Sequence, residues 1–360
     1  MKLPTELLFL ASLLLYPTAS APTPSINRRS ASFPSLRGLT ALEHDYSNSE
    51  AFSHPTKFFH ESTFSHHYDG RFASAELPHH SRQFHLRLML RAYTEAMARI
   101  GIRTWLMHGC LLGWWWNARL MPWDTDLDFM VDEPGIDQLG NWWNMTIHHF
   151  TSAELDLHTD PSPDAGVLLA DDQGLSLKKL QEDVIRVGGK KYLLEINPHA
   201  ANASTRDTEN VIDARWIDTA TGLFIDITTV HIQPVSMDPY ADASLFNTAD
   251  DQELYTKDQH AYSSSQIYPL RESKLENVSV KIPFLYEELL LEEYGKKALT
   301  RTWFHGWKFD KERMQWIMDG AEEVVTKYTG EGYKGKGREK EYMRLAGEEA
   351  EVGLDDFNGV

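Results

Sequence analysis

The sequence has little of what would cross-link it covalently or bind it to polyanions. It contains one cysteine, Cys110, in 360 residues. No disulfide can form within the chain, so its stability must come from a hydrophobic core. Lys and Arg number 35 against 53 Asp and Glu, which gives a formal net charge of −18. This balance argues against nucleic acid or an anionic membrane surface as a partner, because both require clustered basic side chains.

Long hydrophobic runs are also scarce. The run Leu7–Leu15 is too short to span a bilayer comfortably. It follows Lys2 and precedes the small residues Ala19–Ala21, a pattern that predicts a secretory signal over residues 1–21. An uncleaved anchor, holding the protein to a membrane through its N-terminus, is the alternative. Residues 22–56 are rich in Ser, Pro and Ala without periodicity, and we expect a flexible stem there.

Three sequons agree with a secretory signal: Asn144-Met-Thr, Asn202-Ala-Ser and Asn277-Val-Ser. Together they predict that the body of the chain lies in the lumen of the secretory pathway, with the Golgi as the expected compartment. Five histidines upstream match no compact metal site, and we interpret them as surface residues: His60, His66, His67, His79 and His80.

The central motif of the chain is an acidic run. Asp124, Asp126 and Asp128 alternate with Thr125, Leu127 and Phe129. In a strand this period of two sets three carboxylates on one face. Such carboxylates repel one another, and the usual compensation is Mg²⁺ or Mn²⁺ held by one or two carboxylates and by substrate phosphates. The alternative interpretation is a solvated acidic strand edge.

A glycine-bracketed segment precedes this run. Gly109 and Gly113 follow the apolar residues 104–107, and they predict a tight turn whose backbone amides, that of Leu111 included, approach a phosphate. A glycine turn alone is weak evidence. Its position just before the acidic run makes the prediction of a phosphate-handling site stronger.

A second landmark lies at residues 211–228. Two β-like runs, 213–217 and 223–228, are separated by a turn at Gly222 and predict a hairpin. Asp226 stands in the apolar second run, where an unpaired buried carboxylate costs roughly several kcal/mol. We therefore expect it beside a cation or an arginine. Either it is a third metal-site carboxylate or general base, or it forms a structural ion pair with Arg215, which is itself a candidate phosphate clamp.

These motifs carry a resemblance. The run His108–Gly113 followed by Pro122–Asp128 resembles the core signature of the LicD/fukutin-type nucleotidyltransferase-fold family. Residues Trp114–Asn117 look most like the fungal branch associated with mannosylphosphate transfer. Two departures are Cys110, where Thr or Ser is commoner, and Trp116, which replaces an Arg typical of bacterial choline-phosphate members. The second departure argues against choline phosphate as the transferred group.

The resemblance implies a fold and a set of roles. The implied fold is α/β (α+β), a nucleotidyltransferase-like mixed sheet flanked by helices, with insertions, over residues 57–310. A C-terminal helix and a charged tail are expected over residues 311–360. The implied catalytic and metal-binding residues are Asp126, Asp128 and Asp226, with Asp124 orienting a ligand and with Gly109, Leu111, Gly113 and Arg215 contacting the substrate.

The implied activity is a metal-dependent transfer of a sugar phosphate. The expected donor is GDP-mannose, and the expected acceptors are mannose hydroxyls of glycoprotein glycans. Two alternatives remain: a metal-dependent glycosyltransferase that releases GDP, or a non-catalytic accessory subunit that acts with a partner.

The remaining periodicity predicts helices over 82–100, 135–150 and 283–295 and strands over 103–107, 126–131 and 191–197. In the second helix, Trp142, Trp143 and Ile147 fall on one apolar side. They are expected to pack in the core, with a sugar-stacking wall as the alternative.

Overall fold

The computed structural model describes residues 30–48, 57–157, 173–233 and 251–318. The expected signal over 1–21, part of the expected stem and most of the expected C-terminal tail lie outside these residues. Within them, no helix has the length and apolar character needed to cross a membrane.

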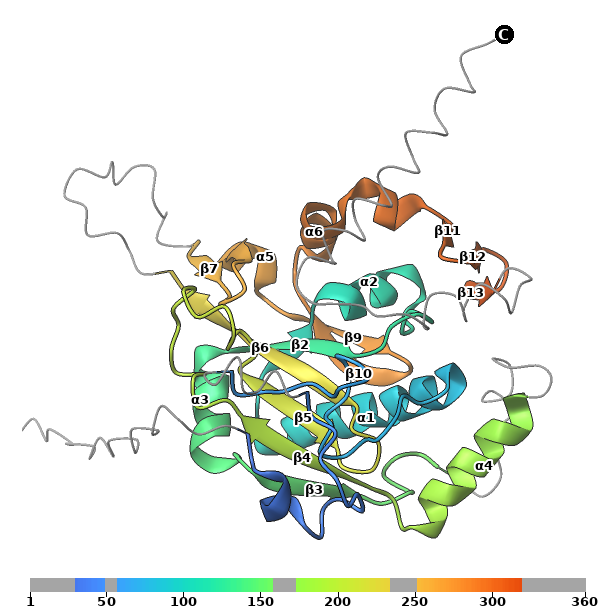
Figure 1. The fold of residues 1–360 in the computed structure, drawn as a ribbon. Coiled ribbons are helices and arrows are strands. Elements are labelled where there is room, and N and C mark those ends of the chain that lie inside the picture. Colours follow the sequence, from blue (N-terminus) through green and yellow to red (C-terminus); the bar gives the residue numbers. More distant parts are fainter. Residues whose placement is uncertain (1–29, 49–56, 158–172, 234–250, 319–360) are drawn as a thin grey trace, which may run out of the picture.

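A mixed sheet of eight strands forms the centre of the molecule (Figure 1). Its path is β1-β2-β6-β5-β4-β3, and β7 and β8 extend it from β6. Strands β2 and β6 run parallel, and the other strand pairs of the described chain are antiparallel. The strands are β1 Thr104–Leu106, β2 Leu127–Asp132, β3 Thr146–Phe150, β4 Lys190–Ile196, β5 Ala214–Asp218, β6 Phe224–Ile232, β7 Glu253–Tyr255 and β8 Ala261–Ser263.

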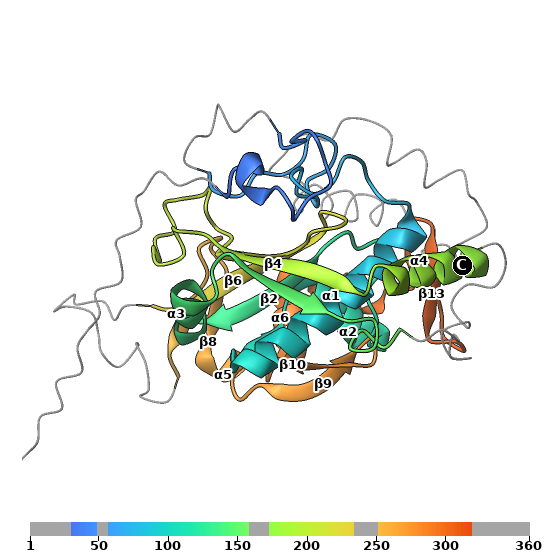
Figure 2. The ribbon, with the colours of Figure 1, turned by 90° about the horizontal axis from the view of Figure 1, so that it is seen from below.

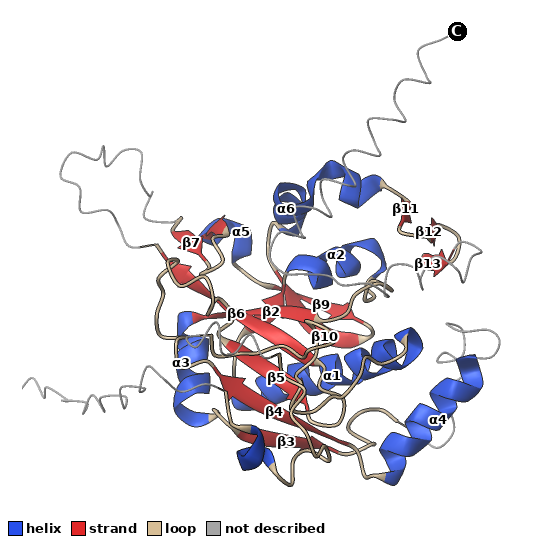
Figure 3. Ribbon diagram, in the orientation of Figure 1, coloured by secondary structure: helices blue, strands red, loops and turns tan. Residues whose placement is uncertain are grey.

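Helices and two small sheets surround the central sheet (Figure 3), which confirms the predicted fold class. The helices are η1 Phe33–Leu36, α1 His79–Ile100, α2 His108–Asn117, α3 Glu133–Trp142, α4 Gln173–Arg186, α5 Ser264–Ile267 and α6 Tyr286–Thr300. The small sheets consist of β9 Arg271–Leu275 with β10 Val278–Ile282, and of β11 Trp303–Phe304, β12 Trp307–Asp310 and β13 Gln315–Met318.

The two faces of the sheet are covered by different parts of the chain. Figure 2 shows the N-terminal segment on one side of the sheet and α1 on the other. α1 buries an apolar stripe that includes Leu86, Met89 and Tyr93, because these residues recur at helical spacing. The helix ends at Gly101, whose φ of 75° favours glycine.

The N-terminal segment packs on the opposite face. Leu36 is 1% exposed and lies in one apolar cluster with Phe72, Leu193, Ile217 and Phe224. Residues 30–48 of the expected stem therefore form part of the domain's cover. Their sequence lacks periodicity because the segment contributes single side chains to the sheet and contains only the short 3-10 helix η1.

Several predicted elements agree with the structure. The strands over 103–107 and 191–197 correspond to β1 and β4, the hairpin to β5 and β6, and the first predicted helix to α1. The final predicted helix corresponds to α6, in which Gly295 interrupts the helical dihedrals with a φ of 71°.

Other predictions were wrong. The segment expected as one helix over 135–150 divides into α3 and β3, because Met145 adopts a φ of 59° that a helix does not continue through. The start of the helix expected after residue 310 instead contains β13, which pairs with β12. The acidic run is a strand only from Leu127 onward, so Asp124 and Asp126 lie in the preceding loop.

Candidate active site

A row of charged residues crosses the middle of the sheet. Asp128 on β2 lies opposite Asp226 on β6, Asp226 lies opposite Arg215 on β5, and Arg215 lies opposite Glu195 on β4. Directly paired residues project to the same face of a sheet. The pairing of β2 with β6 and of β6 with β5 therefore places these four side chains side by side beneath the N-terminal segment.

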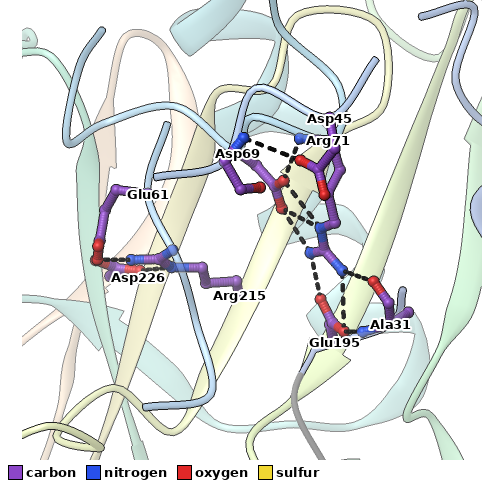
Figure 4. A network of polar contacts seen from close by, with 9 residues as sticks. Ala31, Asp45, Glu61, Asp69, Arg71, Glu195, Arg215 and Asp226 are labelled. Atoms are coloured by element: carbon purple, nitrogen blue, oxygen red, sulfur yellow. Dashed lines mark hydrogen bonds and ion pairs between the residues drawn. The ribbon is translucent and has the colours of Figure 1, made fainter. Parts of the chain in front are cut away.

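Arg215 is the hub of this row (Figure 4). Its Nε donates to Asp226 Oδ1 at 2.7 Å, and its Nη2 lies 3.4 Å from Glu61 Oε1. The guanidinium also lies 3.8 Å from the ring centroid of Phe224 and 4.9 Å from that of Phe59. At 3% exposure, Arg215 matches the ion-pair alternative, and its guanidinium is not presented to a ligand in this arrangement.

The loop that carries Asp124 and Asp126 is held from two sides. The Gln83 side chain on α1 donates to the carbonyl oxygens of Pro122 at 3.2 Å and of Asp124 at 3.1 Å. On the other side, the Trp123 ring packs against Phe304 and Trp316, with centroids 4.9 and 5.0 Å apart. The loop is therefore clamped between α1 and the small sheet β11–β13.

Two charged side chains from the N-terminal region reach the acidic site. His67 Nδ1 lies 2.9 Å from Asp126 Oδ2, and Glu61 contacts Arg215. The sequence interpretation placed His67 on the surface and did not single out Glu61. Their segment has no periodicity, and only its docking on the sheet brings them to the site.

The charges at this site shift one another's proton affinities. Burial and the adjacent charge of Asp126 raise the pKa of Asp128 well above its ordinary value, and the same two causes raise the pKa of Asp124 to about 8. Burial acts against ionisation of Asp126 too, but His67 holds the pKa of Asp126 below its ordinary value. Burial also opposes protonation of His67, yet the charge of Asp126 raises the pKa of His67 to about 9.

Asp128 is the least compensated member of this group. Among the described residues, no hydrogen bond or ion pair is made to its carboxylate, whereas Asp126 has His67 and Asp226 has Arg215. Burial raises the pKa of Asp226 despite the opposing charge of Arg215. The arrangement thus holds more carboxyl groups than its two cations, His67 and Arg215, can pair with, which is why several of their pKa values are raised.

The predicted glycine turn is the first part of a helix. Residues 108–117 form α2, and His108 at its start has a φ of 52°. Gly109 lies near Asp124, because a Cβ built on Gly109 would stand 3.8 Å from Asp124 Oδ1. The amide of Leu111 already donates to the carbonyl oxygen of Met107 at 3.2 Å. The amides before it, in the first turn of α2, lack internal acceptors, so this end of the helix retains part of the donors that the turn was expected to provide.

The other two residues of this segment serve packing. The side chain of Leu111 is 1% exposed in the core. A Cβ on Gly113 would stand 2.5 Å from the carbonyl oxygen of Arg119, so only glycine allows this close approach. Cys110 is also buried, and burial raises the pKa of its thiol well above its ordinary value.

The donor chemistry of the site fits a hard divalent cation, but the side chains are not arranged as a complete cage. In residues 30–48, 57–157, 173–233 and 251–318, no three His, Cys, Asp or Glu side chains are grouped so that they could hold a metal ion. Carboxylate oxygens suit Mg²⁺ and Mn²⁺, and Mg²⁺ takes only one or two protein carboxylates when phosphates and waters complete its shell. Asp126 and Asp128 meet that smaller requirement.

Comparison with known proteins shows what the sequence around this site is similar to. Residues 101–160, which contain α2 and the acidic run, match the family model "LicD/FKTN/FKRP, nucleotidyltransferase domain". The predicted resemblance is confirmed: over these residues the chain is similar to a LicD-type nucleotidyltransferase domain.

Two curated relatives from Saccharomyces cerevisiae are similar to the chain. "Mannosyltransferase regulator 4" is 26% identical over 200 residues, which cover 53% of this chain and 14% of the relative. "Mannosyltransferase regulator 14" is 26% identical over 171 residues, which cover 46% of this chain and 15% of the relative. The chain thus matches only a small part of the length of either relative. Both are fungal proteins, in agreement with the predicted branch.

Proposed function

We propose that the protein is a glycan-modifying phosphotransferase of the secretory pathway. It transfers a sugar phosphate, mannose 1-phosphate from GDP-mannose, to a mannose hydroxyl of a glycoprotein glycan. The observation that carries this proposal is the pairing of Asp128 with Asp226 beside Asp126 and its loop. An excess of partly buried carboxylates on two adjacent strands and the loop before one of them matches the demands of phosphoryl transfer, which needs charge neutralisation and in-line positioning.

In the proposed mechanism Asp126 and Asp128 hold Mg²⁺ or Mn²⁺ together with the donor phosphates. The cation neutralises charge on the phosphate oxygens when bound. Asp226 lies beside these ligands with one carboxylate oxygen fixed by Arg215, which leaves the other oxygen to join the ligand set or to accept the proton of the attacking hydroxyl. Asp124 lies beside Gly109 of α2 and accepts a hydrogen bond from the N–H of Met121 at 3.2 Å, so it orients the loop that carries Asp126.

In the proposed transfer the acceptor hydroxyl displaces GMP from the phosphorus next to mannose. The acceptor oxygen forms a bond to the phosphorus next to mannose, and the bond from that phosphorus to the bridging pyrophosphate oxygen breaks. The proton of the hydroxyl passes to Asp226, and GMP leaves. The first amides of α2, near Gly109, are the proposed donors to the phosphates, and His67 adds a positive charge beside Asp126.

A second candidate is a regulatory or accessory role. Its support is that both relatives are named mannosyltransferase regulators. In this role the domain binds donor or glycan and acts on a partner transferase without turnover of its own.

The test is an assay of the secreted protein with GDP-mannose, Mn²⁺ and a mannose oligosaccharide, in which the released nucleotide is identified. We expect GMP that depends on the acceptor and is lost in Asp126→Asn. The control is Asp137→Asn, which removes an exposed carboxylate of α3.

Each other result selects a different function. Release of GDP would indicate glycosyl transfer and overturn the phosphotransferase proposal. Cation-dependent stabilisation with no nucleotide release would favour the regulatory role. GMP release that survives in Asp126→Asn would remove this aspartate from the mechanism.

A further inference from the structure

An exposed apolar patch lies far along the sheet from the acidic site. Trp142 is 76% exposed, Met145 42% and Ile147 37%. We call these three residues the Trp142 patch. They belong to the end of α3, the following turn and β3, which is the edge strand opposite β1 in the sheet order. The expectation that Trp142 packs in the core was therefore wrong.

A sequon occupies the middle of this patch. Asn144, Met145 and Thr146 link α3 to β3, and Asn144 is exposed. Asn144 Oδ1 accepts a hydrogen bond from the backbone N–H of Ile196 at 3.0 Å. This contact fixes the side-chain amide by its oxygen. No other described group takes a hydrogen bond from Nδ2, which is the atom that N-glycosylation modifies.

The backbone holds the sequon in a tight turn. The N–H of Thr146 donates to the carbonyl oxygen of Trp143 at 3.3 Å, and its hydroxyl donates to the same oxygen at 2.6 Å. Trp142 and Asn144 are two residues apart, so their Cα atoms are at most about 7 Å apart. A sugar attached to Asn144 is thus within reach of the exposed indole.

We propose that Asn144 carries an N-linked oligosaccharide whose first sugar packs on the Trp142 ring and covers the Trp142 patch. The polarised C–H groups on the face of N-acetylglucosamine match the negative face of an indole. The inference rests on the proposed secretory location. It does not depend on the proposed transfer activity.

The modification requires a lipid-pyrophosphate-linked oligosaccharide as co-reactant. Asn144 Nδ2 forms a bond to C1 of the first sugar and loses a proton. The bond from C1 to the phosphate oxygen breaks, and the lipid pyrophosphate leaves. The amide oxygen is unchanged, so its hydrogen bond from Ile196 is retained.

The other two sequons provide an internal comparison. The residues two positions before Asn202 and Asn277 are Ala200 and Leu275, and both are buried. Neither sequon therefore has an exposed ring two residues before its asparagine. Stabilisation by a stacked glycan is therefore specific to Asn144.

The test uses protein secreted from a eukaryotic host, with Asn202→Gln and Asn277→Gln to leave one sequon. Glycopeptide mass spectrometry is expected to show a glycan on Asn144. Trimming to the first N-acetylglucosamine should leave the midpoint of thermal unfolding unchanged, whereas complete enzymatic removal should lower it by about 2 °C or more. In Trp142→Ala, complete removal of the glycan should lower the midpoint of thermal unfolding by less than half as much.

Enzymatic removal of the glycan converts Asn144 to Asp both in the protein with Trp142 and in Trp142→Ala. The difference between their two shifts in unfolding midpoint therefore measures the contribution of the Trp142 ring alone. Trp142 is largely exposed, and its replacement leaves the core intact. An unmodified Asn144 overturns the inference. Equal shifts in the two proteins overturn it as well, since the glycan then does not use the ring. Nucleotide release is measured separately on the same protein, so the two proposals fail independently.

Discussion

Two charged clusters beneath the N-terminal segment differ in how their charges are compensated. In the first, Arg71 lies 2.6 Å from both Asp69 Oδ2 and Glu195 Oε2, and its side chain is 5% exposed (Figure 4). In the second, Asp128 lies among other carboxylates, and no hydrogen bond or ion pair to its own carboxylate occurs among the described residues. The comparison separates a cluster whose charges are paired within the fold from one that contains a carboxylate without such a partner among the described residues.

The largest expected effect is on the compensated cluster. Arg71→Met would leave Asp69 and Glu195 buried without their cation, so we expect the free energy of unfolding to fall by about 3–5 kcal/mol. Chemical denaturation measures this. Arg99→Met removes a cation with exposed partners and should cost about 1 kcal/mol or less. Similar losses for the two variants would contradict the distinction.

A substitution in the acidic site should lower activity rather than stability. Asp128→Asn removes one of several like charges, so we expect no loss of stability but a fall in transfer activity of about 100-fold or more. Thermal unfolding and nucleotide release are measured on the same preparation. A variant that is clearly destabilised while activity persists would assign Asp128 to the fold.

A divalent cation should stabilise the protein through the acidic site alone. At a concentration 100 times its Kd, Mg²⁺ or Mn²⁺ is expected to raise the free energy of unfolding by about 2.7 kcal/mol. A chelator should reverse the gain, and Asp126→Asn should abolish it, while Asp137→Asn should retain it. Equal stabilisation of the two variants would place the cation elsewhere.

The smallest expected effect is the pH dependence of an ion pair beside the site. His108 Nδ1 lies 2.7 Å from Glu293 Oε1. Burial acts to lower the pKa of His108, but the charge of Glu293 raises it from 6.5 to about 10. The folded state then binds this proton more tightly than the unfolded state, so the stabilisation is complete below pH 6.5 and is lost as the pH rises towards 10.

We expect this loss to reach at least about 1.4 kcal/mol, the equivalent of one pKa unit. Unfolding curves from pH 6 to pH 9 would measure it. In Glu293→Gln the slope over this range should flatten, whereas Glu95→Gln at an exposed pair should leave it unchanged. A slope that is the same in both variants would show that the pair does not control this dependence.

Much of the acidic site was accessible from the sequence because its parts lie in local patterns. Asp226 in an apolar strand predicts a neighbouring cation or arginine, and the structure shows the ion pair with Arg215 that was the alternative to a metal-site role. The motif order also places Asp128 near Asp226, and the structure sets them opposite each other.

The remainder depends on contacts between distant segments. His67 and Glu61 approach the sheet through a segment with no periodic pattern, so no local signal marks them. The end of α3 was missed because Trp142 and Ile147 suggest a continuous apolar face, whereas the turn at Met145 separates them. The two glycines of α2 suggest a turn in the sequence, but glycine is also required inside a helix where another backbone group comes close. Gly113 is such a position, because a Cβ there would stand 2.5 Å from the carbonyl oxygen of Arg119.

The small sheet β11–β13 has a consequence for the order in which the site is completed. A ribosome makes the chain from its N-terminus, so all the aspartates proposed to act in transfer emerge before Phe304 and Trp316 do. The Trp123 ring has these partners only after residue 316 is synthesised and folded back. A growing or prematurely terminated chain therefore carries every proposed ligand while the loop of Asp126 lacks one of its two supports. Competence for binding is expected to arise late in biosynthesis.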